Sequence, residues 1–245
     1  MKKYLKLFIA LFAALAIMLV FTGCQKDDGI IKMGTNAEFP PFEYVENGEY
    51  AGIDVELAQA IAKELGKELE IVDMAFNALI DALNSGKVDF VAAGMSVDPE
   101  REKNVDFTIK YYNATQTIIV QAGNENIKSK DDLVGKKIGV QTGTTGYDVA
   151  VEIKDAVVST YENGLEATMD LANGNIDAVI IDDFPAKKYV EKNPGLKLVD
   201  GQFEEEQYAM AVKKGNKKLL EQINKALQKL MDDGTYDKIL EKYSD

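Results

Sequence analysis

The chain has 245 residues, and its 28 Lys and Arg against 41 Asp and Glu give a formal net charge of −13. This acidity disfavours nucleic acid and anionic membrane surfaces as partners. With no histidine and a single cysteine, the composition also disfavours a structural zinc site, a catalytic triad that uses histidine, and an internal disulfide.

Residues 1–23 have the pattern of an export signal. Lysines flank the start of a run from Leu5 to Phe21 that is nearly all apolar. A transmembrane anchor is the alternative, but the run is near the lower length limit for spanning a bilayer, and the polar residues after it favour cleavage. Cleavage would remove three lysines and no acids, so the formal charge would move from −13 to −16. The remaining length suits two modest lobes or one large domain.

Apolar runs and amphipathic stretches alternate along the chain, which is typical of an α/β fold. In the first half the spacing predicts a strand at 30–35, a helix at 54–65, a strand at 69–74, a helix at 76–84, a strand at 88–93 and a short helix from Pro99. Gly66 and Gly86 stand where the first two of these helices should end.

A second α/β series follows an extended run at 115–121. It comprises a strand at 137–141, a helix at 145–153, a strand at 157–161, a helix at 165–172 and a strand at 178–181. Residues 208–212 are again extended, and two amphipathic helices at 217–231 and 236–243 follow, separated by Gly234.

The two series contain a short internal echo. Residues 83–89 (LNSGKVD) match residues 171–177 (LANGNID), with Leu, Gly and Asp in register. Five residues after each Asp stand Gly94 and Asp182. Two α/β units of one design would place both positions at the carboxyl ends of strands, where ligands bind in open sheets. The echo supports two lobes, although so short a match can also arise by chance.

Arg101 is the only arginine of the chain. A guanidinium has five donors in a planar fork, and a carboxylate is its usual target. The alternative interpretation is an ordinary exposed residue of a short helix.

Four motifs resemble the polar amino acid-binding proteins of ABC importers: residues 34–42, 93–101, 141–145 and 233–236. The resemblance covers essentially the whole chain after the signal. It implies a type II periplasmic-binding-protein fold, a "Venus flytrap" of two α/β lobes with mixed central sheets, joined by two extended hinge crossovers near 113–116 and 205–208. Lobe 1 would comprise 30–113 plus 208–245, and lobe 2 would comprise 114–207.

The resemblance also implies a site for a free L-amino acid and partners in the membrane, a permease and an ATPase. No cofactor and no metal are expected, and a monomer is expected. The implied ligand-binding residues are Asn36, Phe39, Phe76, Gly94, Met95, Ser96, Arg101, Gln141, Thr144, Thr145 and Asp182.

Each end of the amino acid has candidate partners, because burying either charge unpaired is costly. Arg101 would clamp the carboxylate, helped by Ser96 and by the helix start at Thr144 and Thr145. Asp182 would pair with the ammonium, with the Gly94 carbonyl and the Ser96 hydroxyl. Asp182 could instead cap the helix near Pro185, and Gly94 could be a close-packing glycine.

The ligand's side chain would lie between Phe39 and Phe76, whose rings favour a flat or cationic group. The ring of Phe39 is expected to be exposed, between a strand end and a Pro-Pro turn. Asn36 and Gln141 are neutral. Glu38 is close by in the sequence and could either supply a negative charge or be a solvent-facing loop residue. Arginine, lysine, ornithine and glutamine are all candidate ligands, and basic ligands are favoured.

Val20 to Cys24 resembles the lipid-attachment box of bacterial lipoproteins, although Phe21 replaces the usual Leu. Cys24 would then carry the lipid, and residues 24–29 would form a tether on the outer face of the cytoplasmic membrane, of the Gram-positive type, or in the periplasm. A plain secretory signal is the alternative.

Two other classes of function compete with transport. A dehydratase on the same scaffold would need a general acid in the cleft, for which Glu38, Glu43 and Asp182 are the candidates, the first two in a predicted loop. A receptor module that only reports the ligand would need a separate signalling partner. We expect no enzymatic activity.

Overall fold

A computed structural model describes residues 29–201 and 203–244. The predicted signal peptide and Cys24 lie outside these residues, as does the tether apart from Gly29. Residues from Ile31 onward form one compact unit. Among the described residues, we find no helix with both the length and the apolar character that a membrane crossing requires.

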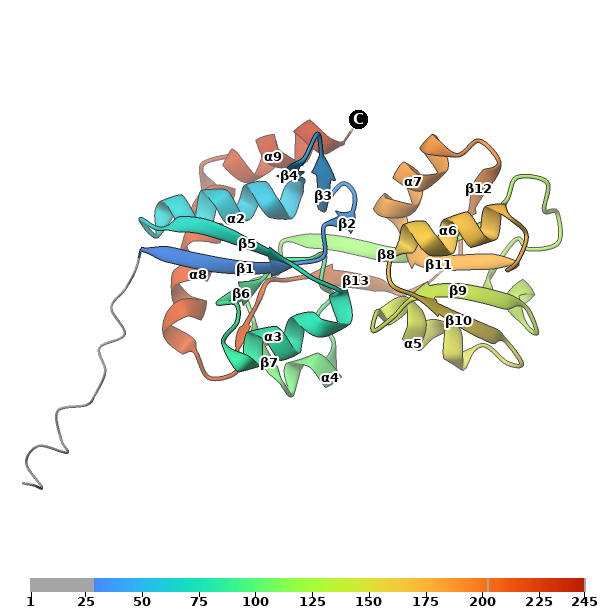
Figure 1. The fold of residues 1–245 in the computed structure, drawn as a ribbon, viewed down its shortest axis with the longest axis horizontal. Helices are drawn as coiled ribbons and strands as arrows, with labels where there is room; N and C mark the ends of the chain where they lie inside the picture. Colours follow the sequence, from blue (N-terminus) through green and yellow to red (C-terminus); the bar gives the residue numbers. More distant parts are fainter. Residues whose placement is uncertain (1–28, 202, 245) are drawn as a thin grey trace, which may run out of the picture. The chain divides into compact units, whose positions relative to one another are not determined.

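The first sheet has five strands in the order β5-β1-β6-β14-β7 (Figure 1). Its strands are β1 (Ile30–Thr35), β5 (Glu68–Asp73), β6 (Phe90–Val91), β7 (Val105–Phe107) and β14 (Ala211–Lys213). Strand β1 is parallel to β6, whereas β14 is antiparallel to both β6 and β7. The sheet is therefore mixed and includes a strand from near the end of the chain.

Five of the described helices belong to the part of the chain around this sheet, and all but the shortest bury apolar residues. They are α2 (Ile53–Glu64), α3 (Leu79–Ser85) after a 3₁₀ turn at Phe76–Ala78, α4 (Pro99–Glu102), α8 (Lys217–Asp232) and α9 (Thr235–Tyr243). The faces of α2 and α8 are buried through residues at helical spacing, such as Leu57 and Ile61 on α2 and Ile223 and Leu227 on α8. Because α2 contacts both α8 and α9, the end of the chain completes the core around β1 and β6.

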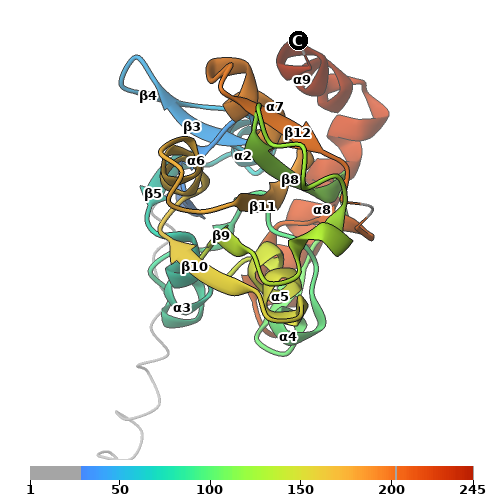
Figure 2. The same cartoon turned by 90° about the vertical axis from the view of Figure 1, so that its right-hand side faces the viewer.

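The second sheet contains β8 (Tyr112–Gln121), β9 (Lys137–Gln141), β10 (Val157–Tyr161), β11 (Ala178–Asp182), β12 (Leu196–Val199) and β13 (Glu205–Tyr208). Its helices are α5 (Thr145–Glu152), α6 (Gly164–Ala172) and α7 (Asp183–Lys192), and a 3₁₀ turn spans Lys130–Leu133. Strands β9, β10 and β11 run parallel, and β8 is antiparallel to β11. Figure 2 shows α5 and α6 on opposite faces of this sheet.

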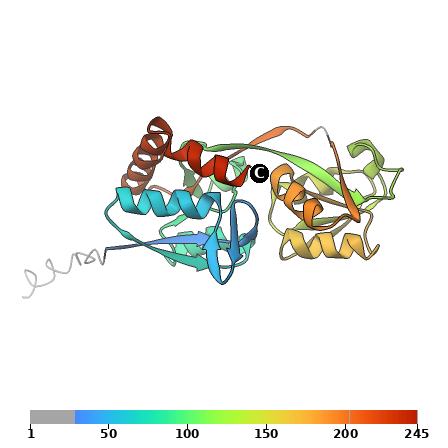
Figure 3. The same ribbon diagram turned by 90° about the horizontal axis from the view of Figure 1, so that it is seen from above.

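The two segments predicted as crossovers are paired strands. Residues Glu205 to Tyr208 of β13 lie antiparallel to Thr115 to Tyr112 of β8, and both strands can be followed in Figure 3. Mixed sheets on an α/β scaffold confirm the predicted fold class. The exact lobe boundaries stay a prediction.

A small third sheet was not predicted from the sequence. It joins β2 (Glu38–Phe39), β3 (Glu43–Glu46) and β4 (Glu49–Ala51) in antiparallel order. The prediction that Glu38 and Glu43 lie in a loop is therefore wrong. Two predicted strands also differ, because only Phe90–Val91 of residues 88–93 is a strand, and the run 208–212 is divided between β13 and β14.

Candidate functional site

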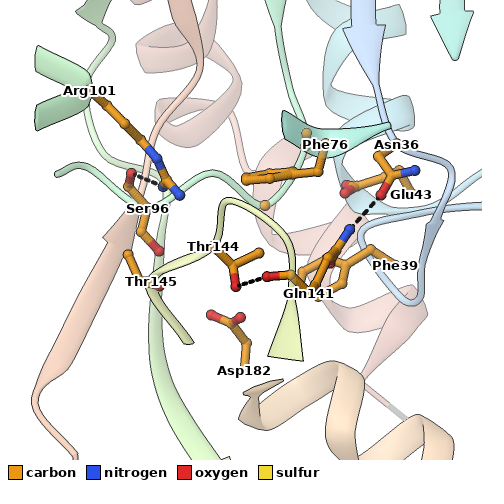
Figure 4. A pocket seen from close by; sticks show the side chains of 12 residues that line it. Asn36, Phe39, Glu43, Phe76, Ser96, Arg101, Gln141, Thr144, Thr145 and Asp182 are labelled. Atoms are coloured by element: carbon orange, nitrogen blue, oxygen red, sulfur yellow. Dashed lines mark hydrogen bonds between the residues drawn. The ribbon is translucent and has the colours of Figure 1, made fainter. Parts of the chain in front are cut away.

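One pocket gathers most of the residues predicted to bind ligand (Figure 4). About 320 Å³ of space that no atom occupies lies within it, open solvent at its mouth included. The lining residues are Asn36, Phe39, Glu43, Phe76, Ala93, Gly94, Ser96, Arg101, Gln141, Thr144, Thr145 and Asp182. Met95 is the one predicted residue that does not line the pocket, because its side chain is buried in a core cluster with Leu79 and Val91.

The pocket lies at the carboxyl ends of parallel strands in both sheets. Asn36 follows β1, Gly94 follows β6, Gln141 ends β9 and Asp182 ends β11. This is the edge at which open α/β sheets bind ligands.

The internal echo has the same structure in both copies. Gly86 and Gly174 adopt left-handed φ values of 79° and 78° at the ends of α3 and α6. The carboxylates of Asp89 and Asp177 then accept backbone hydrogen bonds from Lys32 and Lys137, at 2.7 Å and 2.8 Å. Each Asp thus ties the strand that follows it to the neighbouring parallel strand. Gly94 and Asp182 therefore lie at the carboxyl ends of corresponding strands in the two sheets.

Arg101 is held in the pocket by carbonyl groups. Its Nη1 donates to the carbonyl of Ser96 at 2.8 Å, and its Nη2 donates to the carbonyl of Gly143 at 3.0 Å. The guanidinium also lies over the Phe76 ring, 5.4 Å from its centroid, and burial lowers the pKa of Arg101. The short helix α4 positions it, because the Asp98 carboxylate caps the helix by accepting from the Arg101 backbone N–H at 3.1 Å.

Asp182 is a buried acid that accepts a hydrogen bond from the Tyr208 hydroxyl at 2.7 Å. It occupies the N-cap position of α7, but its side chain makes no capping hydrogen bond. The capping alternative is therefore wrong. Burial, with the nearby charge of Glu206 as the next cause, raises the pKa of Asp182 to about 7.

Glu43 and Asp54 form a buried acidic pair beside the pocket. Neither oxygen of Glu43 accepts from a donor group, so the hydrogen bond between Glu43 and Asp54 is one that a proton shared by the two acids makes, and Glu43 lines the pocket. One oxygen of Asp54 accepts from the Gly94 N–H at 2.8 Å and from the Tyr111 hydroxyl at 2.7 Å. Burial, then the charge of Asp54, raises the pKa of Glu43 well above its usual range, and burial raises the pKa of Asp54 to about 6.

Gly94 fits the loop above Asp54 because it has no side chain. Its φ of +51° favours glycine, and a Cβ there would lie 2.7 Å from Cε1 of Phe39. Close packing therefore explains why the residue is glycine, and a ligand role for its carbonyl stays a prediction.

The aromatic and amide residues form the other end of the pocket. Gln141 donates from Nε2 to Oδ1 of Asn36 at 2.8 Å, and both side chains are buried. The prediction of an exposed Phe39 ring is wrong, since Phe39 is buried and stacks on Phe42. Glu38 is exposed, accepts from Asn163 at 3.0 Å and does not line the pocket.

The predicted ligand-binding residues left out three residues at the site: Ala93, Glu206 and Glu43, the last of which was named only as a candidate general acid. An Asn47-Gly48 turn, whose φ values are both positive, is a strong hairpin signal that would have placed Glu43 on a strand. No pattern in the sequence marks Glu206, whose carboxylate accepts hydrogen bonds from Ser96 and Thr145 of the pocket lining.

Comparison with known proteins gives a family match over the whole unit described above. The model for bacterial extracellular solute-binding proteins, family 3, matches residues 31–245. The arginine-binding extracellular protein ArtP of Bacillus subtilis (strain 168) is 37% identical over 252 residues, which is 99% of this chain and 98% of that protein. Other relatives are named for histidine or cystine.

Solved structures agree with this match. An ancestral arginine-binding protein bound to arginine has a TM-score of 0.85 and 47% identity, and the alignment covers 88% of this chain and 98% of that one. An ancestral amino acid-binding protein described as a precursor of cyclohexadienyl dehydratase has a TM-score of 0.83 and 40% identity, over 88% and 95% of the two chains.

Proposed function

Because this chain belongs to family 3 of the bacterial extracellular solute-binding proteins, we propose that it captures a free basic L-amino acid, arginine in the first place, for an ABC importer. Relatives named as arginine-binding proteins of such transporters support the proposal. So does the similarity to an arginine-binding protein bound to arginine.

The observation that carries the proposal is that Arg101 and Asp182 line the same pocket. A free amino acid presents a carboxylate and an ammonium on one carbon, and each needs a partner when buried. Arg101 and the N–H groups at the start of α5 would take the carboxylate, and Asp182 would take the ammonium. Since these groups come from the two different sheets, ligand would stabilise the closed arrangement of the hinge.

Glu43 supports a basic side chain over a neutral one. Its carboxyl group is hydrogen-bonded to Asp54 and lines a pocket whose only cation among the lining residues is Arg101. A ligand guanidinium or ammonium would pair with this acidic group, with Phe39 and Phe76 as apolar and aromatic walls. The Gln141–Asn36 pair offers amide groups to the same end of the ligand.

A thermal-shift screen of the twenty amino acids with ornithine and citrulline tests this proposal, because a ligand that binds only the native state raises Tm. Arginine should give the largest shift, and lysine or ornithine should exceed citrulline and glutamine. No shift with any amino acid, or the largest shift with an acidic one, would contradict the proposal.

Glu43 also favours a second candidate, the dehydratase. A buried acid in the pocket with a raised pKa is what a general acid requires. We nevertheless propose a binding protein without catalytic activity, because the relatives are named as binding proteins. Incubation with arogenate, followed by ultraviolet absorbance of the aromatic product, should show no turnover.

We further propose that the exported chain is a monomer anchored through a lipid on Cys24, with residues 24–29 as the tether. The family is extracellular, and the Val20–Cys24 segment supports lipid attachment. Metabolic labelling with a radioactive fatty acid should mark the wild-type protein and leave Cys24→Ala unlabelled.

A further inference from the structure

Glu206 on β13 accepts hydrogen bonds from the hydroxyl groups of two pocket residues. Its carboxylate accepts from Ser96 Oγ at 2.5 Å and from Thr145 Oγ1 at 2.7 Å. Gln116 Nε2 lies 3.3 Å from both the Glu206 carboxylate and Thr145 Oγ1. Ser96 and Gln116 are buried, and Glu206 is half-buried.

These contacts determine whether each hydroxyl group can donate or accept a hydrogen bond in the pocket. A hydroxyl has one proton to donate and two lone pairs that accept. Because the Ser96 and Thr145 hydroxyls donate their hydrogen bonds to Glu206, each can act only as an acceptor towards the pocket. Thr145 Oγ1 already accepts one hydrogen bond, from Gln116, and retains one lone pair. An ammonium needs acceptors, whereas a carboxylate needs donors.

Glu206 also brings a negative charge to the same part of the site. Its charge is the largest cause, after burial, of the raised pKa of Asp182. The acceptors of Ser96 and Thr145 therefore lie in a region that already favours a cation. Thr145 was expected to help bind the ligand carboxylate, and its hydroxyl is oriented for the opposite group.

We propose that Glu206 is a positioning residue that makes the site selective for ligands with an α-ammonium, by holding Ser96 and Thr145 as acceptors beside Asp182. This inference rests on the proposed function. It leaves recognition of the carboxylate to Arg101 and to backbone N–H groups.

The test compares L-arginine with its deaminated counterpart, 5-guanidinopentanoate, by calorimetry on the wild type and on Glu206→Gln. The amide group that this substitution introduces would donate to one hydroxyl and turn the proton of that hydroxyl towards the pocket. The variant should bind arginine about 10- to 100-fold more weakly, the range expected for hydrogen bonds to a charged group. Its affinity for the deaminated acid should stay within about threefold of wild type or improve.

Glu205→Gln is the matched control, because Glu205 is the exposed neighbour on the same strand; it should leave both affinities unchanged. If Glu206→Gln does not fold, Thr145→Ala provides a second test. By removing one acceptor, it should lower the ratio of the affinity for L-arginine to the affinity for 5-guanidinopentanoate. Equal losses for both ligands, or no loss, would overturn the role of Glu206. Failure of the wild type to bind any amino acid would instead overturn the proposed function, and the role of Glu206 with it.

Discussion

The affinity for amino acids should depend on pH through Asp182. Its pKa of about 7 means that about half of the molecules carry a proton there at pH 7. An ammonium beside Asp182 favours the ionised carboxylate, so binding must release that proton. If the pKa in the complex falls below about 3, acidification from pH 8 to pH 5 weakens binding about 90-fold, or about 2.7 kcal/mol.

Titration calorimetry at both pH values, in buffers with different ionisation enthalpies, measures the affinity and the protons released together. The ratio of affinities for L-arginine and 5-guanidinopentanoate isolates Asp182, because both ligands present the same side chain to Glu43. This ratio should fall on acidification, and Asp182→Asn should abolish the dependence while weakening arginine far more than the deaminated acid. A ratio that is constant from pH 8 to pH 5 would refute the assignment of the ammonium to Asp182.

Three other outcomes follow from the same contacts. Arg101→Lys should weaken arginine at least about 30-fold in calorimetry, because a point charge cannot replace the guanidinium fork; unchanged affinity would contradict its clamp role. The raised pKa of Asp182 means that the contribution of this group to stability is fully present below its unfolded pKa of about 4 and is lost as pH rises through 7. The change in Tm over this range should therefore be less favourable in wild type than in Asp182→Asn, and identical pH profiles of Tm would contradict this. Gly94→Ala should cost more free energy of unfolding than Gly86→Ala in urea titrations, since both have positive φ but only a Cβ at Gly94 would meet Phe39; equal costs would mean that the ring moves aside.

The regular elements were predictable where local signals agreed. The strands 137–141 and 157–161 have the predicted bounds, because short apolar runs there are bounded by polar residues. Helix α5 begins at Thr145, as predicted, since Thr144 provides a cap by accepting from the Tyr147 N–H. The short helix predicted from Pro99 is α4, which begins at Pro99 and carries Arg101 as expected.

Elements that depend on distant partners were less predictable. Strands β3 and β4 are mostly exposed and polar, so periodicity gives no signal for them. The run 208–212 was expected to be continuous, but the chain passes there from pairing with β8 to pairing with β6 and β7. That transfer between two sheets is set by tertiary structure, which a local pattern does not contain.

The acidic residues of the site were the hardest to interpret from sequence, because a carboxylate in a polar run is usually solvated. Burial of Glu43, Asp54 and Asp182 arises only when strand ends and the hairpin meet. Asp54 accepts from Gly94 and Tyr111. Asp182 accepts from Tyr208, whereas Glu43 accepts from no donor group and its hydrogen bond is with Asp54.

This distribution of charge favours one class of ligand. Arg101 is engaged with carbonyl groups, so it retains its positive charge for an incoming anion. In the proposed function, Glu43 and Asp182 would provide two sites for cations. An amino acid with a basic side chain carries one negative and two positive charges, and these complement the three groups one to one. A neutral side chain would leave Glu43 buried and protonated, which costs less than a buried unpaired charge. The ratio of the affinity for arginine to the affinity for citrulline should therefore decrease as pH falls.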